Sequence, residues 1–472
     1  MSLATRFQHM RINLYKTPLP RDNGEKWIMT AHGGGPATGS CAAVKGIVDA
    51  AAQHPKVNVV GFIDGFEGMM SGEAIILGRN LLDGVELDGG VFLGTARRNP
   101  TENERGELVA QLRKWGLTGG IIIGGDDSNT SGARMNLAGF PMNGVPKTID
   151  NDVPGTQRTY GADTAVAETA LMLKSLADDA MTQDLISLYV VSIMGRMSGS
   201  WALEAGLAAK SNIILIPEMF SVKGLREILS LTNADFPKKD DLIARISNVL
   251  KVNGKLLSFS RFARAIEGQS LTDADLKLCA DLLATEVAKI TLNNTYDGIR
   301  HGVVVVSEGL AGKLPTRPVT FNEKSEAIEF EVEGLLTKEE LSDGKRIVIC
   351  VDAHNNPRVA DVKIEQPLAD LIRRETKKLG IPAKVVAQSA GYQFRSLRPK
   401  ASDVRLAMNM GAMAANLLLQ GKSGRMVVVN GYDELGSVDY RDLPYADGHL
   451  IPRVVDLSKA TFINAMGIGG FC

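Results

Sequence analysis

The residues best suited to chemistry lie in two neighbouring segments of the chain, 124–128 and 146–152. Each segment follows a short apolar run, so we expect both at the carboxyl ends of parallel strands, where open α/β sheets bind ligands. Between them they hold four carboxylates and one ammonium group, those of Asp126, Asp127, Asp150, Asp152 and Lys147. Such a set at one sheet edge indicates a site for phosphoryl transfer.

The pair Asp126 and Asp127 follows an apolar run and two glycines, which allow a ligand to approach the backbone closely. Carboxylates in this position are typical ligands of Mg²⁺, which takes one or two carboxylates together with phosphate oxygens and water. The alternative is that an aspartate caps a helix that begins near Asn129.

Lys147 precedes Asp150 by three residues, so the ammonium could meet an anion while the carboxylate removes a proton from a hydroxyl group. An alcohol is a weak nucleophile until it is deprotonated, and phosphoryl transfer needs little beyond one base, a metal and well-placed cations. An isolated lysine and aspartate would indicate a surface ion pair instead. The neighbouring acidic segment favours catalysis.

A glycine-rich turn at 33–40 follows another apolar run and opens a predicted helix. Backbone amides without side chains at a helix N-terminus can face a phosphate group. The turn lacks the dinucleotide fingerprint, because Thr38 stands where glycine is required, and it lacks the Gly-Lys-Ser/Thr ending of a P-loop. A tight connection between a strand and a helix is the alternative.

Charged and aromatic residues follow other short segments in the same manner. They are Arg97 after 89–95, Arg196 after 188–193, Glu308 after 303–306, and Tyr392 and Arg395 after 385–387. Guanidinium groups bind phosphates through paired hydrogen bonds, and a carboxylate suits sugar hydroxyls. For each residue alone, a loop salt bridge is the commoner role.

The elements that must position these residues alternate along the chain. The expected strands are 27–30, 57–63, 120–123, 188–193, 212–216, 303–306, 346–351, 385–387 and 426–429, and the expected helices are 107–115, 164–180, 199–210, 367–379 and 403–419. Buried strands joined by crossover helices predict an α/β protein with two doubly wound, Rossmann-like domains.

The first predicted domain holds residues 1–159 and about 400–472, since the long helix from Asp403 is expected to return to the first sheet. The second holds 160–399 and the strands from 188 to 387. Residues 222–289 are rich in Lys, Asp, Leu and Ala without a convincing strand, so they are predicted to form a helical insertion.

Composition argues against several classes of function. The chain has 472 residues with 53 Lys and Arg against 54 Asp and Glu, so no bulk charge attracts nucleic acid or anionic membrane. No apolar run reaches the ~18 residues of a membrane span, and residues 1–16 lack the apolar stretch of a signal peptide. Four scattered cysteines fit a reducing compartment. We therefore expect a soluble cytoplasmic protein.

Together these motifs resemble the phosphofructokinase family, in which Gly-Gly-Asp, Thr-Ile-Asp-Asn-Asp and Met-Gly-Arg segments occur in this order. The resemblance runs from the turn at Gly33 to the helix at Asp403, nearly the whole chain. It implies the fold of that family, with Mg²⁺ and diphosphate bound by the first domain and fructose 6-phosphate by the second.

The resemblance also implies roles for individual residues. Asp126 corresponds to the Mg²⁺ ligand and Asp150 to the base that acts on the sugar 1-hydroxyl. The fructose 6-phosphate site would comprise Thr148, Ile149, Asp150, Asp152, Met194, Gly195, Arg196, Glu308, Tyr392 and Arg395. Gly35, Arg97 and Lys147 would bind diphosphate, and Asp127, Lys147 and Arg196 would join Asp150 in catalysis.

Two positions bear on the phosphoryl donor. Members that use ATP have glycine where this chain has Asp127 and Lys147, whereas the pyrophosphate-using members resemble this chain at both. A carboxylate at Asp127 would occupy the space and charge of the ATP α-phosphate, while Lys147 would neutralise a diphosphate leaving group. The resemblance therefore implies reversible, Mg²⁺-dependent phosphorylation of fructose 6-phosphate by diphosphate in glycolysis and gluconeogenesis.

Two departures concern regulation. Ser187 and Val386 stand where bacterial ATP-dependent members place arginines that reach a neighbouring subunit's site. We therefore expect a homodimer or homotetramer without allosteric control. An ATP-dependent enzyme and a non-catalytic regulatory subunit stay open as alternatives, and so does activity on sedoheptulose 7-phosphate.

Overall fold

The structure is a computed structural model of the chain. It describes residues 24–220, 251–252, 255–256, 301–313, 316–322, 327–332, 347–350, 358–378, 380–381, 383–431 and 434–456. These residues form two compact units. Unit 1 comprises 24–165 and 392–453, and unit 2 comprises the described residues of 166–391 together with 454–456.

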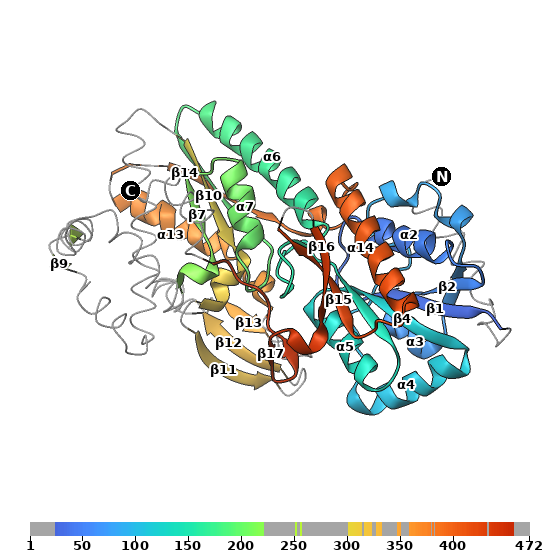
Figure 1. The fold of residues 1–472 in the computed structure, drawn as a ribbon. Coiled ribbons are helices and arrows are strands. Elements are labelled where there is room, and N and C mark those ends of the chain that lie inside the picture. Colours follow the sequence, from blue (N-terminus) through green and yellow to red (C-terminus); the bar gives the residue numbers. More distant parts are fainter. Residues whose placement is uncertain are drawn as a thin grey trace, which may run out of the picture. The chain divides into compact units, whose positions relative to one another are not determined.

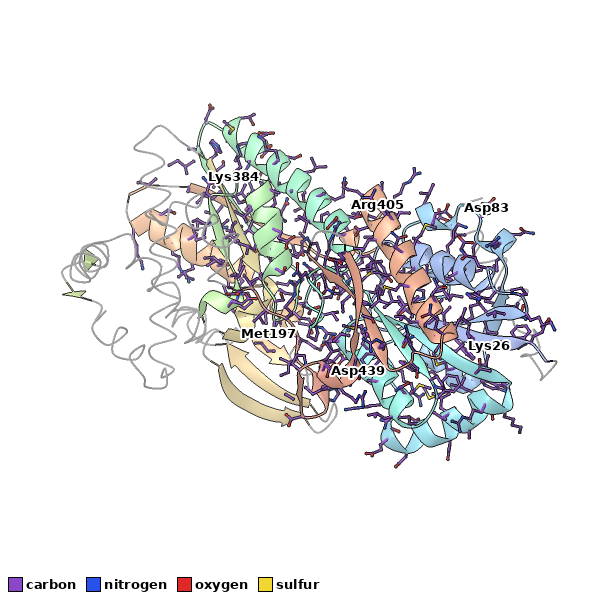
Figure 2. The ribbon with its side chains drawn as sticks, in the orientation of Figure 1. Lys26, Asp83, Met197, Lys384, Arg405 and Asp439 are labelled. Atoms are coloured by element: carbon purple, nitrogen blue, oxygen red, sulfur yellow. The ribbon has the colours of Figure 1, made fainter. Side chains whose placement is uncertain are left out.

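A seven-stranded sheet in the order β16-β15-β5-β4-β1-β2-β3 forms the middle of unit 1 (Figure 1). Its strands are β1 (Lys26–His32), β2 (Val57–Phe62), β3 (Ala74–Leu77), β4 (Leu117–Gly124), β5 (Met142–Pro146), β15 (Arg425–Asn430) and β16 (Glu434–Asp439). The five inner strands run parallel, and antiparallel β3 and β16 form the edges. Lys26 and Asp439 mark β1 and β16 in Figure 2. Because β4 lies between β1 and β5, the segments after these three strands meet at one edge.

Helices cover both faces of this sheet (Figure 1). Helices α2 (Ser40–Ala51) and α14 (Ala401–Leu419) pack on one face, and α3 (Phe66–Ser71), α4 (Glu102–Lys114) and α5 (Asp126–Leu137) pack on the other. Successive side chains of a strand point to opposite faces. Ile121 and Ile123 accordingly join the core under α2 and α14, whereas Ile122 joins the core under α3 and α4. Burial on both faces explains the continuous apolar runs of the sequence.

Helices α2 and α14 approach each other through glycines. A β-carbon added to Gly46 would lie 2.0 Å from the carbonyl oxygen of Met408, and one added to Gly411 would lie 2.1 Å from that of Ala43. Any larger residue would collide with backbone, so glycine sets the separation of the two helices.

Unit 2 contains a four-stranded parallel sheet in the order β14-β6-β10-β7. Its strands are β6 (Ile186–Ile193), β7 (Ile213–Leu215), β10 (His301–Ser307) and β14 (Ala383–Ala390), and its helices are α6 (Ala162–Met181), which begins in unit 1, α7 (Ser200–Ala208) and α13 (Glu365–Lys378). Two units built on parallel strands and connecting helices confirm the predicted α/β fold class.

A separate three-stranded antiparallel sheet contains β11 (Thr316–Asn322), β12 (Ala327–Val332) and β13 (Val348–Cys350). The prediction that 346–351 adds a strand to the parallel sheet is wrong, because β13 pairs antiparallel with β12. A short apolar run predicts a strand but not its partner, which contacts with distant residues decide.

Smaller elements complete the described residues. They are β8 (Lys251–Val252), β9 (Lys255–Leu256), β17 (Tyr445–Ala446), β18 (His449–Leu450) and the 3-10 helices η1 (Arg79–Leu82), η2 (Val85–Leu87), η3 (Pro217–Phe220), η4 (Glu308–Lys313), η5 (Val359–Val362), η6 (Tyr392–Phe394) and η7 (Tyr440–Asp442). Apart from β8 and β9, the predicted helical insertion at 222–289 lies outside the described residues.

The chain crosses between the units after residues 165, 391 and 453. Tyr392 and Arg395 fall in the second predicted domain, 160–399, whereas both belong to unit 1, because the chain enters that unit directly after β14. The assignment of diphosphate to one domain and fructose 6-phosphate to the other stays a prediction. Among the described helices, none combines the length and apolarity that a membrane span requires.

Candidate active site

The segments after β1, β4 and β5 come together at the carboxyl edge of the unit 1 sheet. Ser128 fills the space between the ends of β1 and β4. A β-carbon added to Gly33 would lie 2.3 Å from its Oγ, and one added to Gly124 would lie 2.3 Å from its Cβ. From β5, the amide of Lys147 donates to the Gly124 carbonyl at 2.8 Å. The glycine turn and the two acidic segments are therefore immediate neighbours.

Asp126 and Asp127 form the first turn of α5, so this helix begins three residues earlier than the expected start near Asn129. Its N-cap residue is Gly125, and neither aspartate takes that position. Asn129 holds the start of the helix instead, because its side-chain amide donates to the carbonyls of Gly124 at 2.8 Å and Gly125 at 2.9 Å. The positive end of the helix dipole favours the two carboxylates.

The acidic pair suits a hard divalent cation. Asp126 and Asp127 are both half-buried. In the described part of the chain, no group of three or more His, Cys, Asp and Glu side chains could hold a metal by itself. Mg²⁺ does not require such a group, because one or two carboxylates, phosphate oxygens and water complete its octahedral shell. The residues present therefore fit the predicted metal, with Asp126 as the predicted ligand.

The ammonium group of Lys147 is buried in the glycine turn. Its Nζ donates to the carbonyl of Gly33 at 2.8 Å and also to that of Gly35, and the residue is 2% exposed. Burial, and after it the cation of Arg395, lowers the pKa of Lys147 to about 7, although the carboxylate of Asp150 opposes this change. A phosphate anion beside Lys147 would favour the charged ammonium again.

His32 lies directly before the turn and is fully buried. Burial, and then the charge of Lys147, lowers the pKa of His32 to about 3. The imidazole is therefore neutral at physiological pH and adds no positive charge to the turn.

Arg395 belongs to the same edge of unit 1. A β-carbon added to Gly35 would lie 3.3 Å from Nη1 of Arg395, so the guanidinium lies against the backbone of the turn. The guanidinium also lies 4.7 Å from the ring centre of Tyr392, within the range of a cation–π interaction. Tyr392 itself is 68% exposed. The structure therefore brings the side chains of Arg395 and Lys147 to the backbone of Gly35.

Arg97 and its neighbour Arg98 differ in their surroundings. Arg97 is exposed and follows Ala96, whose carbonyl accepts a hydrogen bond from the Gly34 amide at 3.3 Å. Arg98 forms salt bridges with Glu67 at 3.2 Å and Glu104 at 2.6 Å. Arg98 thus takes the commoner structural role. Arg97 stays the predicted phosphate ligand, but the run before it forms no strand and only a single bridge from Ala96 to Gly33.

The second acidic segment, residues 146–152, is a tight loop after β5. The amide of Asp150 donates to Oγ1 of Thr148 at 3.1 Å, and Ile149 is buried beneath. Asn151 has a left-handed backbone with φ of 52°. Asp150 is half-buried, whereas Asp152 is 5% exposed. Accessibility therefore favours Asp150 as the carboxylate that meets a substrate.

Unit 2 holds the third motif, Met194, Gly195 and Arg196, directly after β6. The amides of Gly195 and Arg196 donate to Oε1 of Glu308 at 3.2 and 2.9 Å. Glu308 is 7% exposed, and the backbone of Arg196 is left-handed with φ of 49°. The structure thus brings the four predicted residues of unit 2 together. Glu308 also fixes the loop, a role that sequence reasoning missed.

Sequence reasoning also missed C-terminal residues that reach the acidic segments. Nδ1 of His449 lies 3.8 Å from Oδ1 of Asp127. The amide of Arg453 donates to the carbonyl of Asp152 at 2.5 Å. No local pattern marks these residues, since the chain returns to the first sheet only after leaving unit 2.

Asp403 is another missed residue of unit 1. Its buried carboxylate accepts hydrogen bonds from the amides of Gly161 and Thr164, each at 2.8 Å. Burial raises the pKa of Asp403, although these hydrogen bonds act in the opposite direction. The carboxylate connects the start of α14 to the chain that leaves the second acidic segment.

Comparison with known proteins shows which family the chain resembles. The profile described as Phosphofructokinase matches residues 27–293. The ATP-dependent 6-phosphofructokinase of Streptococcus agalactiae serotype III (strain NEM316) is 29% identical over 357 residues, 75% of this chain and 100% of that protein. The pyrophosphate--fructose 6-phosphate 1-phosphotransferase of Naegleria fowleri is 26% identical over 443 residues, 91% of this chain and 84% of that protein.

A solved structure shows the same fold. The pyrophosphate-dependent phosphofructokinase from Marinobacter aquaeolei gives a TM-score of 0.60 at 18% identity, covering 94% of this chain and 90% of that one. The family profile spans more than half of the sequence and contains the glycine turn, both acidic segments and the Met-Gly-Arg loop. The chain therefore belongs to the phosphofructokinase family.

Proposed function

We propose that this protein transfers a phosphoryl group reversibly from diphosphate to the 1-hydroxyl of fructose 6-phosphate, with Mg²⁺ as cofactor. The products are fructose 1,6-bisphosphate and phosphate. One observation carries the choice of donor: a carboxylate, Asp127, and a buried ammonium, Lys147, flank the end of β4. Family membership supports phosphofructokinase activity, and this pair supports diphosphate in place of ATP.

Asp127 selects the donor by repulsion. It directly follows Asp126 in the first turn of α5, so a nucleotide bound at that metal ligand would bring its α-phosphate near the carboxylate. Two like charges brought together in this half-buried site cost about 2 kcal/mol. Diphosphate has no further phosphate or nucleoside and avoids this repulsion.

Lys147 supplies the compensating positive charge. Its ammonium lies between the carbonyls of Gly33 and Gly35, beside the guanidinium of Arg395. Diphosphate oxygens would accept hydrogen bonds from Lys147 and Arg97 and would approach the backbone of Gly35. This positive charge would stabilise the phosphate that leaves.

Asp150 acts as the base. Its half-buried carboxylate removes the proton from the sugar 1-hydroxyl as the oxygen attacks the transferring group. Mg²⁺ bound by Asp126 would neutralise charge on the transferring phosphoryl group. Thr148, Ile149 and Asp152 shape the loop around the base. Met194, Gly195, Arg196, Glu308, Tyr392 and Arg395 are proposed to hold the sugar phosphate, with Arg196 also acting on the transferring group.

An ATP-dependent enzyme is the second candidate, because the relative from Streptococcus agalactiae carries that name. A non-catalytic regulatory subunit is a third candidate. The intact set Asp126, Asp150 and Asp152 argues against it, since a protein that only binds sugar phosphate needs neither the metal ligand nor the base. Cytoplasmic location and a homodimer or homotetramer without allosteric control complete the proposal.

Initial rates of the purified chain test this function, with diphosphate or ATP as donor and fructose 6-phosphate or sedoheptulose 7-phosphate as acceptor. Turnover with diphosphate and Mg²⁺, and none above background with ATP, is the expected result. Comparable use of ATP would exclude the donor selection by Asp127. Absence of turnover with both donors would favour the regulatory subunit.

A further inference from the structure

Asn151 adopts an unusual backbone conformation between the two carboxylates of the second acidic segment. Its φ of 52° lies in the left-handed region, which residues other than glycine seldom occupy and which asparagine adopts at a smaller cost than most. Since Asp150 and Asp152 are its direct neighbours, this conformation sets the direction in which each carboxylate leaves the loop.

Thr159 and Arg453 both hold Asn151, one through its side chain and the other through its carbonyl. Its side-chain Oδ1 accepts hydrogen bonds from the amide of Thr159 at 3.0 Å and from Oγ1 of the same residue at 3.4 Å. Its carbonyl accepts a hydrogen bond from Nη2 of Arg453. The amide of Arg453 also donates to the carbonyl of Asp152 at 2.5 Å. Arg453 thus contacts two consecutive carbonyls of the loop.

The segment that carries Arg453 is itself anchored on α5. The amide of Leu450 donates to Oγ1 of Thr130 at 3.2 Å, and that hydroxyl donates to the carbonyl of Asp126 at 2.8 Å. The guanidinium of Arg134 donates to the carbonyl of Gly448 at 2.8 Å. Residues 448–453 therefore connect the helix of the metal ligand with the loop of the base.

We propose that Arg453 is a positioning residue for this reaction, acting through Asn151 on the carboxylate of Asp150. The charged guanidinium stabilises the left-handed peptide that Asn151 otherwise adopts only at a cost. Without it the loop relaxes towards an ordinary backbone conformation, and Asp150 moves from its position relative to the metal ligand. A displacement of about 1 Å at a reacting group reduces the rate by about 10²-fold.

This inference rests on the proposed role of Asp150 but not on the identity of the donor. All rates are compared with wild type, using whichever donor the wild-type protein accepts. A wild-type protein that uses ATP would overturn the donor proposal and leave the role of Arg453 open to the same test. Hydrogen exchange of the backbone amides provides a second measurement that needs no turnover.

The experiment compares Arg453→Ala with Arg441→Ala, which removes an exposed arginine that pairs with Asp439 in the same part of the chain. In Arg453→Ala we expect kcat to fall by about tenfold to 10²-fold, with KM for both substrates within about twofold of wild type. Methylguanidinium in the buffer should restore part of kcat. Amide exchange across 148–160 should accelerate. Arg441→Ala should change none of these quantities.

Asn151→Gly tests whether the effect passes through the strained residue. Glycine adopts positive φ without the steric cost of a side chain, so the backbone would depend less on Arg453. Because Asn151→Gly also lacks the Oδ1 that accepts from Thr159, the double variant is compared with Asn151→Gly alone and not with wild type. Arg453→Ala should therefore reduce kcat by less than about threefold when Asn151 is already glycine. An equal loss of kcat in both backgrounds would overturn the proposal. So would unchanged kcat and amide exchange in Arg453→Ala, or the same losses in Arg441→Ala.

Discussion

Lys147, whose ammonium is buried against the glycine turn, offers a sharp prediction, because its burial and its hydrogen bonds act in opposite directions on stability. Lowering the pKa of Lys147 from 10.5 to about 7 corresponds to about 5 kcal/mol against the charged form. Lys147→Met keeps the apolar stem and removes this cost. The carbonyls of Gly33 and Gly35 lose their donor, at about 1–3 kcal/mol each. At about pH 6 we therefore expect the stability of the variant to lie between about 1 kcal/mol below and about 3 kcal/mol above that of wild type.

The pH dependence has a definite sign. The pKa of Lys147 is lower in the folded protein than in the unfolded chain, so between about pH 7 and 10.5 the unfolded chain binds more protons. Stability of the wild-type protein therefore rises with pH across this interval, and the destabilisation is fully present below about pH 7. Because Lys147→Met cannot titrate, its stability relative to wild type should fall by about 4 kcal/mol between about pH 6 and pH 10.

Urea unfolding at the two pH values measures this difference, with the slope of the transition checked for each variant. Lys147→Arg is the control, because its guanidinium keeps its charge over the whole range. The arginine variant should be less stable than Lys147→Met at both pH values. A difference between Lys147→Met and wild type that is the same at both pH values would refute the reasoning about the buried ammonium.

Two further predictions concern the metal and the helix contact. Asp126→Asn should weaken Mg²⁺ activation and lower kcat by about 10²-fold or more, because the amide lacks the charge that the cation requires; wild-type activity at wild-type Mg²⁺ concentration would contradict this role. Gly411→Ala should lower stability by about 1–3 kcal/mol, since its β-carbon would lie 2.1 Å from the Ala43 carbonyl oxygen. Gly106→Ala is the matched control in α4, where nothing lies within 4 Å, and it should raise stability by about 0.5–1 kcal/mol. Equal melting temperatures for the two alanine variants would contradict the close contact of α2 and α14.

Much of the fold could be predicted from the sequence where burial on both faces produced long apolar runs. The segment 120–123 is an example, because its isoleucines alternate between two cores and no polar residue interrupts them. The chemistry of the strand ends was also visible, since Asp126, Asp150 and Arg196 each follow such a run. The predicted start of α5 near Asn129 lies three residues too late, because the glycines before the helix resemble a loop.

The features that sequence reasoning missed depend on contacts between residues far apart in the chain. The hydroxyl of Tyr440 donates to Asn129 Oδ1 at 3.1 Å, and the carboxylate of Asp403 accepts a hydrogen bond from the amide of Gly161. No pattern of neighbouring residues in the sequence indicates either contact. The same reason explains β13, whose apolar residues fit either sheet. Arg453 reaches the second acidic segment only because the chain returns to unit 1 near its end.

The central claim is that Asp127 and Lys147 together select the phosphoryl donor. The most direct measurement is the ratio of kcat/KM for diphosphate to kcat/KM for ATP, in wild type and in the double variant Asp127→Gly, Lys147→Gly. Removing one repulsive charge and one stabilising charge, each worth about 2 kcal/mol, should shift this ratio towards ATP by about 10³-fold. A ratio that stays within about threefold of the wild-type value would contradict the account.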